Sequence, residues 1–371
     1  MLLIKEIPAT VRVLLNWTRI AGNSHKSITK KAQAAADTLL RFMRSLILFF
    51  AAVFPAFPQH TLYACVTNAK GYVVGARLAP SGVFRKGAGG TWKHLGFNHP
   101  FTSALAALPA QPGVMLLAAG NGLIQLPGSD APWRILTGSD VTELRDVALD
   151  AHRPNAIYFT HTRGIAASLD GGATWRDATG DLKHRYAESV RVDREHAGVL
   201  LAATEAGLFR SVDDGAHWQL AGASGFQALR VEQSPHDACR WLATTELGGL
   251  FASTDCGRSF ESIAGQVAVD RSLYDLAWDA LLPHRVAAAG FTFGVAVSDD
   301  DGAHWEFRNQ GLPRADVWSV AWDPDHAGRL YASVHEEAVY VSEDAGKSWK
   351  VDGLPGSAVN RFLFAPAAVS K

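Results

Sequence analysis

The octet SLDGGATW occupies residues 168–175, and close copies of it return along the chain at nearly even spacing. The good copies are SVDDGAHW (211–218), STDCGRSF (253–260), SDDDGAHW (298–305) and SEDAGKSW (342–349), and two degraded copies end at Trp92 and Trp133. The closing aromatic residues are therefore 92, 133, 175, 218, 260, 305 and 349, with 41 to 45 residues from each to the next. A fixed period in the low forties is typical of the blades of a β-propeller.

Each period contains the same local signals. In the last one, the β-rich runs VWSVAWDP (317–324), LYASV (330–334), VYVSE (339–343) and SWKV (348–351) are separated by turn-forming residues. Short runs of this kind predict antiparallel strands joined by tight turns. Four strands in each of seven periods predict an all-β protein, a seven-bladed propeller of four-stranded antiparallel blades.

The two ends of the chain are predicted to close the ring together. The segment VNRFLFAP (359–366) resembles the first strand of a period, whereas the N-terminal period starts with TLYACV (61–66), which resembles a second strand. We therefore expect the C-terminal strand to complete the N-terminal blade, because this pairing removes an open sheet edge.

The octets are predicted to be structural. The Asp oxygens can accept hydrogen bonds from N–H groups of their own turn, the Gly permits the turn, and the aromatic residue covers it. The Asp and aromatic residues of the five good copies are Asp170 and Trp175, Asp213 and Trp218, Asp255 and Phe260, Asp300 and Trp305, and Asp344 and Trp349. No catalytic role is assigned to them, since side chains spread around a ring cannot converge on one substrate.

The octet resembles the Asp-box (BNR) repeat, S-x-D-x-G-x-T-W, and the resemblance covers roughly residues 60–366. A single seven-bladed ring is most similar to the photosystem II stability/assembly factor family, and more distantly to sialidase, xyloglucanase and sortilin-type propellers. The resemblance implies a propeller fold with structural Asp boxes. It implies function only weakly, because one fold serves many functions.

The N-terminal residues are predicted to lie outside the propeller. Residues 43–59, MRSLILFFAAVFPAFPQ, resemble a secretory signal, and residues 1–42 form a doubtful extension that is either an over-extended gene model or part of a bipartite targeting peptide. A buried N-terminal helix is the remaining alternative. The propeller is expected to occupy 60–371, and the protein to be exported, either periplasmic or secreted, with the thylakoid lumen as the alternative.

Composition excludes several classes of function. Residues 1–60 hold eight Lys or Arg and two Asp or Glu, so the remaining 27 and 34 give the propeller a net charge of −7. A mildly acidic body argues against a nucleic-acid partner. The sequence contains no HExxH, CxxC, GxSxG or phosphate-binding loop, so no metal and no cofactor is predicted.

The candidate binding site is the face of the ring where the first strands begin, which we call the start face. Varied loops precede these strands, and they carry basic and aromatic residues suited to an interface. The predicted binding residues are Arg145, His184, Arg185, Tyr186, Tyr274, Asp275, Arg314, Trp318 and Arg361. The alternative is that these loops are an ordinary solvent-exposed face, on which nearby carboxylates neutralise the basic charges.

Two classes of function remain. The favoured one is a monomeric, non-catalytic scaffold or assembly factor that binds a protein or peptide, with segments of membrane proteins among the candidates. The alternative is a glycoside hydrolase, which needs two carboxylates about 5–9.5 Å apart. The candidates for such a pair are Asp146, Glu188, Asp275 and Asp316, each at the start of a different blade.

A disulfide between Cys239 and Cys256 is predicted if the protein is exported. The two cysteines flank the second and third strands of the fifth blade, which form a hairpin with its turn near residues 247–249. Folding that hairpin places the cysteines nearly opposite each other, within disulfide reach. A slip of one residue would point the thiols to opposite faces.

Overall fold

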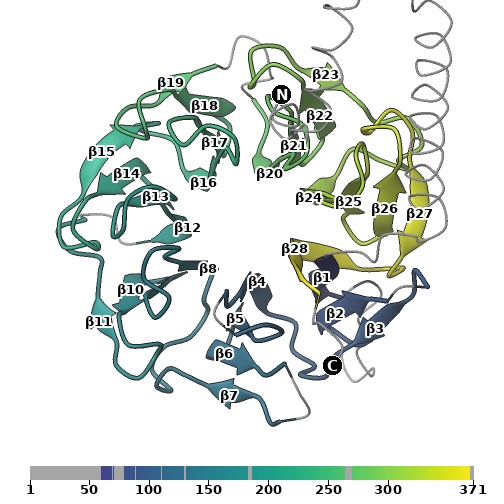
Figure 1. The fold of residues 1–371 in the computed structure, drawn as a ribbon. Coiled ribbons are helices and arrows are strands. Elements are labelled where there is room, and N and C mark those ends of the chain that lie inside the picture. The colour runs from purple at the N-terminus through teal and green to yellow at the C-terminus, as the bar shows by residue number, and fades with distance from the viewer. Residues whose placement is uncertain are drawn as a thin grey trace, which may run out of the picture. The chain divides into compact units, whose positions relative to one another are not determined.

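The computed structural model describes residues 60–68, 70, 79–87, 89–109, 111–128, 131–182, 186–263 and 270–367, all within the compact unit Pro58–Lys371. These residues form seven four-stranded antiparallel sheets arranged as blades around an axis (Figure 1). The prediction of an all-β, seven-bladed propeller is confirmed. The predicted signal and extension, residues 1–59, lie outside the described residues. Among the described residues, no helix has the length and apolar character needed to cross a membrane.

The strands follow the same order in each blade, from the ring axis outward. Blade 1 contains β28 (Ala358–Pro366), β1 (His60–Thr67), β2 (Gly82–Lys86) and β3 (Trp92–His94). Blade 2 contains β4 (Thr102–Ala107), β5 (Met115–Ala119), β6 (Gly122–Leu126) and β7 (Arg134–Ile135), and blade 3 contains β8 (Asp146–Leu149), β9 (Ile157–His161), β10 (Gly164–Ser168) and β11 (Arg176–Asp177). Blade 4 contains β12 (Ala187–Val192), β13 (Leu200–Thr204), β14 (Gly207–Ser211) and β15 (Gln219–Gly222).

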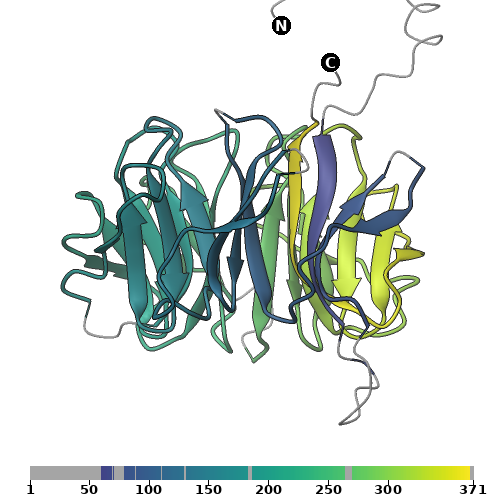
Figure 2. The ribbon, with the colours of Figure 1, turned by 90° about the horizontal axis from the view of Figure 1, so that it is seen from below.

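The remaining three blades repeat this order. Blade 5 contains β16 (Ala228–Gln233), β17 (Trp241–Thr245), β18 (Leu250–Ser253) and β19 (Glu261–Ser262). Blade 6 contains β20 (Leu273–Trp278), β21 (Val286–Gly290), β22 (Gly294–Ser298) and β23 (Glu306–Phe307), and blade 7 contains β24 (Val317–Trp322), β25 (Leu330–Val334), β26 (Ala338–Ser342) and β27 (Lys350–Gly353). Figure 2 shows the blades from the side, with the inner strands running along the ring axis.

The core lies between neighbouring blades. All five residues of β13 and of β21 are buried, and many of them are alanines. One core cluster joins Tyr158 and Ile165 of blade 3 to Val190 and Leu200 of blade 4. Small buried residues let adjacent sheets approach closely, so each blade depends on the next one for its buried surface.

The C-terminal strand closes the ring. β28 pairs antiparallel with β1, with Leu62 opposite Phe364 and Ala64 opposite Phe362, and so supplies the inner strand of blade 1 (Figure 2). Asn360 of this strand also donates from Nδ2 to the carbonyl oxygen of Thr102 in blade 2, at 2.8 Å. The first and last described strands therefore meet in one sheet.

Each good octet forms the turn between the third and fourth strands of its blade. In blade 3, Asp170 Oδ1 accepts from the N–H of Thr174 at 2.9 Å and from Ser168 Oγ at 2.7 Å. Ser168 Oγ in turn accepts from the N–H of Gly172 at 2.8 Å. Hydrogen bonds from Thr174 lower the pKa of Asp170 to about 2, so the carboxylate is ionised and occupied by its own turn.

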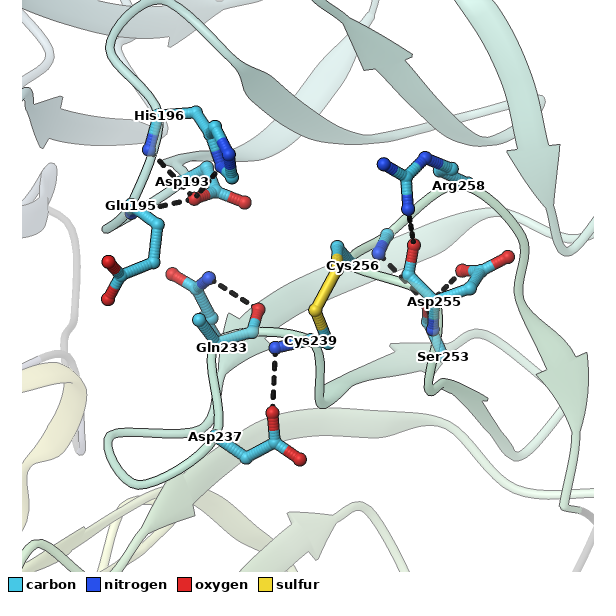
Figure 3. The surroundings of a disulfide bond; sticks show 12 residues. Asp193, Glu195, His196, Gln233, Asp237, Cys239, Ser253, Asp255, Cys256 and Arg258 are labelled. Carbon is cyan, nitrogen blue, oxygen red and sulfur yellow. Dashed lines mark hydrogen bonds and ion pairs between the residues drawn. A yellow bond between two sulfur atoms is a disulfide. The ribbon is translucent and has the colours of Figure 1, made fainter.

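The residue after the octet Asp is tied to a second turn in the same blade. Its N–H donates to the turn that precedes the second strand, as from Ala345 to the Gly328 carbonyl at 2.7 Å and from Cys256 to the Cys239 carbonyl at 3.2 Å. In blade 5 a disulfide between Cys239 and Cys256 joins the same two turns (Figure 3). The covalent bond therefore reinforces a contact that blade 7 makes with hydrogen bonding alone.

Deletion of residues 357–371 is expected to cause aggregation or a large loss of stability, because it removes β28 and exposes the edge of β1. Size-exclusion chromatography and thermal unfolding measure this. Deletion of residues 368–371 alone is the control, since it leaves β28 intact. A protein lacking 357–371 that is as stable as the full chain would contradict the proposed closure.

The double variant Cys239→Ser/Cys256→Ser is expected to keep the fold and to lose about 3 kcal/mol of unfolding free energy, the value for a loop of this length. The fold should survive because the backbone contact between the two turns does not need the sulfur atoms. Denaturant unfolding measures the loss, and reduced wild-type protein should match the variant. Mass spectrometry that finds both thiols free in exported protein would refute the disulfide.

Candidate binding site on the start face

A β-bulge near the start of the first strands creates the site. In β20, Leu273 pairs with Gly290 and Asp275 pairs with Ala289, so Tyr274 between them has no partner in the ladder. The same register shift occurs in five other first strands and leaves out Ser103, Glu188, Leu229, Trp318 and Asn360. In blade 3 the equivalent residue, Arg145, directly precedes β8. Bulges of this kind redirect a side chain away from the regular alternation of a strand.

These seven residues surround one cavity of about 520 Å³. We call them the bulge ring: Ser103, Arg145, Glu188, Leu229, Tyr274, Trp318 and Asn360, one from each blade. Thr67, Pro100, Phe101 and Arg230 complete the lining of this start-face cavity. Its volume lies in the range usual for ligand pockets.

The bulge ring has an aromatic side on blades 6 and 7. The ring centroids of Tyr274 and Trp318 are 4.6 Å apart, and Trp318 stacks on His335 at 4.8 Å. Phe101 of blade 2 is exposed at the margin of the same cavity. Rigid aromatic surfaces provide large apolar contact area at little entropic cost, which suits them to binding.

The bulge ring is charged on blades 3 and 4. The Arg145 guanidinium lies 5.6 Å from the ring centroid of Tyr186, and the Tyr186 hydroxyl donates to Glu188 Oε1. Within the described part of the chain, the buried Nε of Arg145 has no hydrogen-bond partner. Arg145 also lines the start-face cavity, so this side of the bulge ring carries a guanidinium group.

An ion network lies inside the ring, beneath the start-face cavity. It consists of Asp146, Arg191, Arg230, Glu232, Asp275 and Arg361, from five different blades. Arg191 bridges Asp146 and Glu232 at 2.6 Å each, and Arg361 Nη1 lies 2.7 Å from Asp275 Oδ1. Arg361 also bonds Glu232, which links blade 1 to blade 5 across the ring.

The three carboxylates of the network are balanced by three guanidinium groups. Burial alone would raise the pKa of Glu232, but Arg191 and Arg361 outweigh it and hold that pKa at about 2. For Asp275 burial outweighs the attraction of Arg361 and Arg230, so its pKa is raised. Arg230 is paired less closely than the others, at 3.4 Å from both Asp146 and Asp275, and it lines the start-face cavity.

The structure brings together four of the predicted binding residues. Arg145, Tyr274 and Trp318 line the start-face cavity, and Tyr186 contacts Arg145 beside it. Arg314 is exposed on the start face but outside the cavity, where it pairs with Glu337 at 3.0 Å. His184 and Arg185 lie outside the described residues.

The predicted placement of Asp275 and Arg361 in exposed loops needs correction. Both lie within first strands, directly after a bulge residue, and their side chains are only 2% and 14% exposed. The bulge accounts for the difference, because it turns the preceding residue to the cavity and leaves Asp275 and Arg361 in the ion network. Their contacts make them structural members of the ring.

Sequence reasoning missed Ser103, Leu229 and Asn360 of the bulge ring, and Arg191, Arg230 and Glu232 of the ion network. An alignment of the seven first strands by their register would have identified the missed residues of both the bulge ring and the ion network. Arg191 and Glu232, for instance, occupy the position at which blades 6 and 7 have Ala277 and Ala321. Among the described residues, no group of three or more His, Cys, Asp or Glu is arranged to hold a metal ion.

Comparison by sequence gives no relatives. No protein-family model matches the chain, and no curated protein matches it.

Comparison by structure gives several propellers. A GH74 xyloglucanase from Xanthomonas campestris is 20% identical with a TM-score of 0.56, over 68% of this chain and 45% of that one. An ancestral GH74 enzyme is 16% identical with a TM-score of 0.57, over 72% of this chain and 38% of that one. YCF48, in a structure with a bound D1 peptide, is 15% identical with a TM-score of 0.52, over 72% of this chain and 93% of that one.

These likenesses establish the propeller fold and include the families that the octets resemble. The chain spans less than half of the length of the two GH74 enzymes, but the match covers nearly all of YCF48. At such low identity the comparisons do not transfer an activity.

Replacing Arg361 by Leu is expected to lower the free energy of unfolding by about 3–5 kcal/mol, because Asp275 and Glu232 then lose a partner inside the ring. Arg314→Leu is the matched control, and its effect should stay within about 0.5 kcal/mol because Arg314 is exposed. Chemical denaturation compares the two variants. Equal stabilities would show that the ion network does not support the ring.

Proposed function

We propose that the protein is a non-catalytic scaffold that binds a protein or peptide partner in the start-face cavity. The observation that carries the proposal is the bulge ring, in which each of the seven blades contributes one side chain to a single cavity. Six of these positions are β-bulges and the seventh, Arg145, directly precedes its strand, and the seven positions carry seven different residue types. That combination is suited to recognition of an irregular surface, whereas a purely structural ring would favour similar residues.

The cavity favours a segment with acidic and apolar side chains. Arg145 and Arg230 both line it, and Arg230 lies 3.4 Å from each of its two carboxylate partners. A partner carboxylate would pair with these guanidinium groups, which bind carboxylates well. Apolar side chains of the partner would contact Tyr274 and Trp318 on the opposite side of the bulge ring.

The comparison with YCF48 supports a peptide occupant, because that protein was solved with a bound D1 peptide and the match covers 93% of it. The Cys239–Cys256 disulfide supports an exported protein, since disulfides persist in oxidising compartments. We therefore propose a periplasmic, secreted or lumenal scaffold that acts as a monomer, of the kind represented by assembly factors.

The alternative, glycoside hydrolysis, has the GH74 likeness in its favour. The carboxylates around the axis favour binding over hydrolysis, because Asp146 and Asp275 are held in ion pairs and Glu188 is bonded to Tyr186. A glycosidase needs one carboxyl group free to give up a proton and another free to act as base or nucleophile.

The test uses immobilised synthetic peptides, an acidic-aromatic set and a set in which Lys replaces each acidic residue. The protein is expected to bind the acidic set, and the variant Arg145→Glu/Trp318→Ala is expected to lose at least about tenfold in affinity, which is about 1.4 kcal/mol. Lys347→Glu, exposed in the blade 7 octet on the opposite face, is the matched control and should bind as the parent does.

Equal binding of both peptide sets, or unchanged binding by the double variant, would overturn the proposed site. A parallel screen for oligosaccharide hydrolysis tests the alternative. Hydrolysis that Asp275→Asn abolishes, in a variant that still unfolds cooperatively, would establish the enzyme and overturn the non-catalytic scaffold.

A further inference from the structure

A second cavity, of about 300 Å³, lies where the first strands end. Glu232, Asp275 and Arg361 line it, so the ion network borders this end-face cavity as well as the start-face cavity, which Arg230 lines. Arg361 bonds both carboxylates across the ring. The network thus separates two cavities that open at opposite ends of the first strands.

Two alanines leave room for the end-face cavity. Ala277 and Ala321 line it, and they occupy the strand position at which blades 4 and 5 carry Arg191 and Glu232. The long side chains of blades 4 and 5 extend into the network, whereas the methyl groups of blades 6 and 7 do not. The cavity is therefore a consequence of the sequence of two adjacent blades.

Aromatic rings from adjacent blades form the walls. Trp278 ends β20 and Trp322 ends β24, and Phe362 of blade 1 lies beside them in the lining. Each indole is anchored to the preceding blade, Trp322 Nε1 to the Ala277 carbonyl at 3.1 Å and Trp278 Nε1 to the Glu232 carbonyl at 3.4 Å. The walls are thus fixed in orientation before any ligand arrives, which reduces the entropic cost of binding.

The ion network forms the floor of the end-face cavity, and its chemistry restricts the class of ligand that can bind there. The carboxylates and the guanidinium group of the floor are already paired with one another. An ionic ligand would therefore lose its hydration without gaining an ion-pair partner. A wholly apolar ligand would bury the polar floor without giving it new hydrogen bonds. A neutral ligand with several hydroxyl groups and an apolar face satisfies both the floor and the indole walls.

We propose that the end-face cavity binds a neutral sugar ring, either a free monosaccharide or the terminal residue of a glycan. The hydroxyl groups would donate to Glu232 and accept from Arg361, whose side chains are 19% and 14% exposed, while the C–H face of the ring lies on Trp278. This site does not depend on the start-face proposal. It requires binding only, with no bond made or broken.

Isothermal titration calorimetry of the full protein tests the proposal with glucose, galactose and xylose as probes. At least one sugar is expected to bind with a dissociation constant near or below about 1 mM. Glycerol, which has hydroxyl groups but no ring face, and glucuronate, which is charged, should bind at least about tenfold more weakly. These two probes separate the contributions of the indole walls and of the neutral floor.

Variants locate the site. Trp278→Ala should weaken sugar binding at least about tenfold, whereas Trp318→Ala, in the start-face cavity, should leave it unchanged. Ala321→Leu fills the cavity without removing any wall, so it should abolish binding even if Trp278→Ala folds poorly.

Three results would overturn the proposal: no heat for any sugar up to about 10 mM, ten times the expected limit; tighter binding of glucuronate than of glucose; or unchanged binding in a folded Ala321→Leu protein. Loss of sugar binding in Trp318→Ala would likewise contradict the proposal, because it would show that the sugar binds in the start-face cavity. Each of these results can occur whether or not the start-face cavity binds peptides.

Discussion

The pairing of β28 with β1 is the interaction on which the rest of the structure depends. The inner strand of blade 1 comes from the C-terminal part of the chain, so this ladder both completes the sheet and joins the first and last described strands. The same strand supplies Asn360 to the bulge ring and Arg361 to the ion network. The strand that closes the ring therefore also completes the lining of both cavities.

The bulges show how a regular scaffold carries an irregular site. Blade packing demands small apolar residues at most positions of the middle strands, so those positions cannot vary freely. One extra residue in six of the seven first strands is free of that demand, because it is absent from the ladder. The residue type differs from blade to blade at such positions. Because the blades are arranged around a ring, these side chains are turned toward one axis.

The sequence was sufficient to predict the fold because its signals are local and periodic. The octets around Asp170 and Asp344 set the blade period, and the unmatched segment 359–366 predicted the closure. Arg145, Tyr274 and Trp318 were found because they are basic or aromatic residues in the varied segments that lead into the first strands. Arg361 and Asp275 were misplaced because one residue of strand register decides between cavity and network, and register depends on the pairing partner.

Asp275 pairs with Arg230, which lines the start-face cavity, and with Arg361, which lines the end-face cavity. A group that draws Arg230 toward one cavity leaves Asp275 more dependent on Arg361 in the other. Occupants of both cavities would then be linked through a shared carboxylate, and such linkage is reciprocal: each occupant changes the affinity for the other by the same factor.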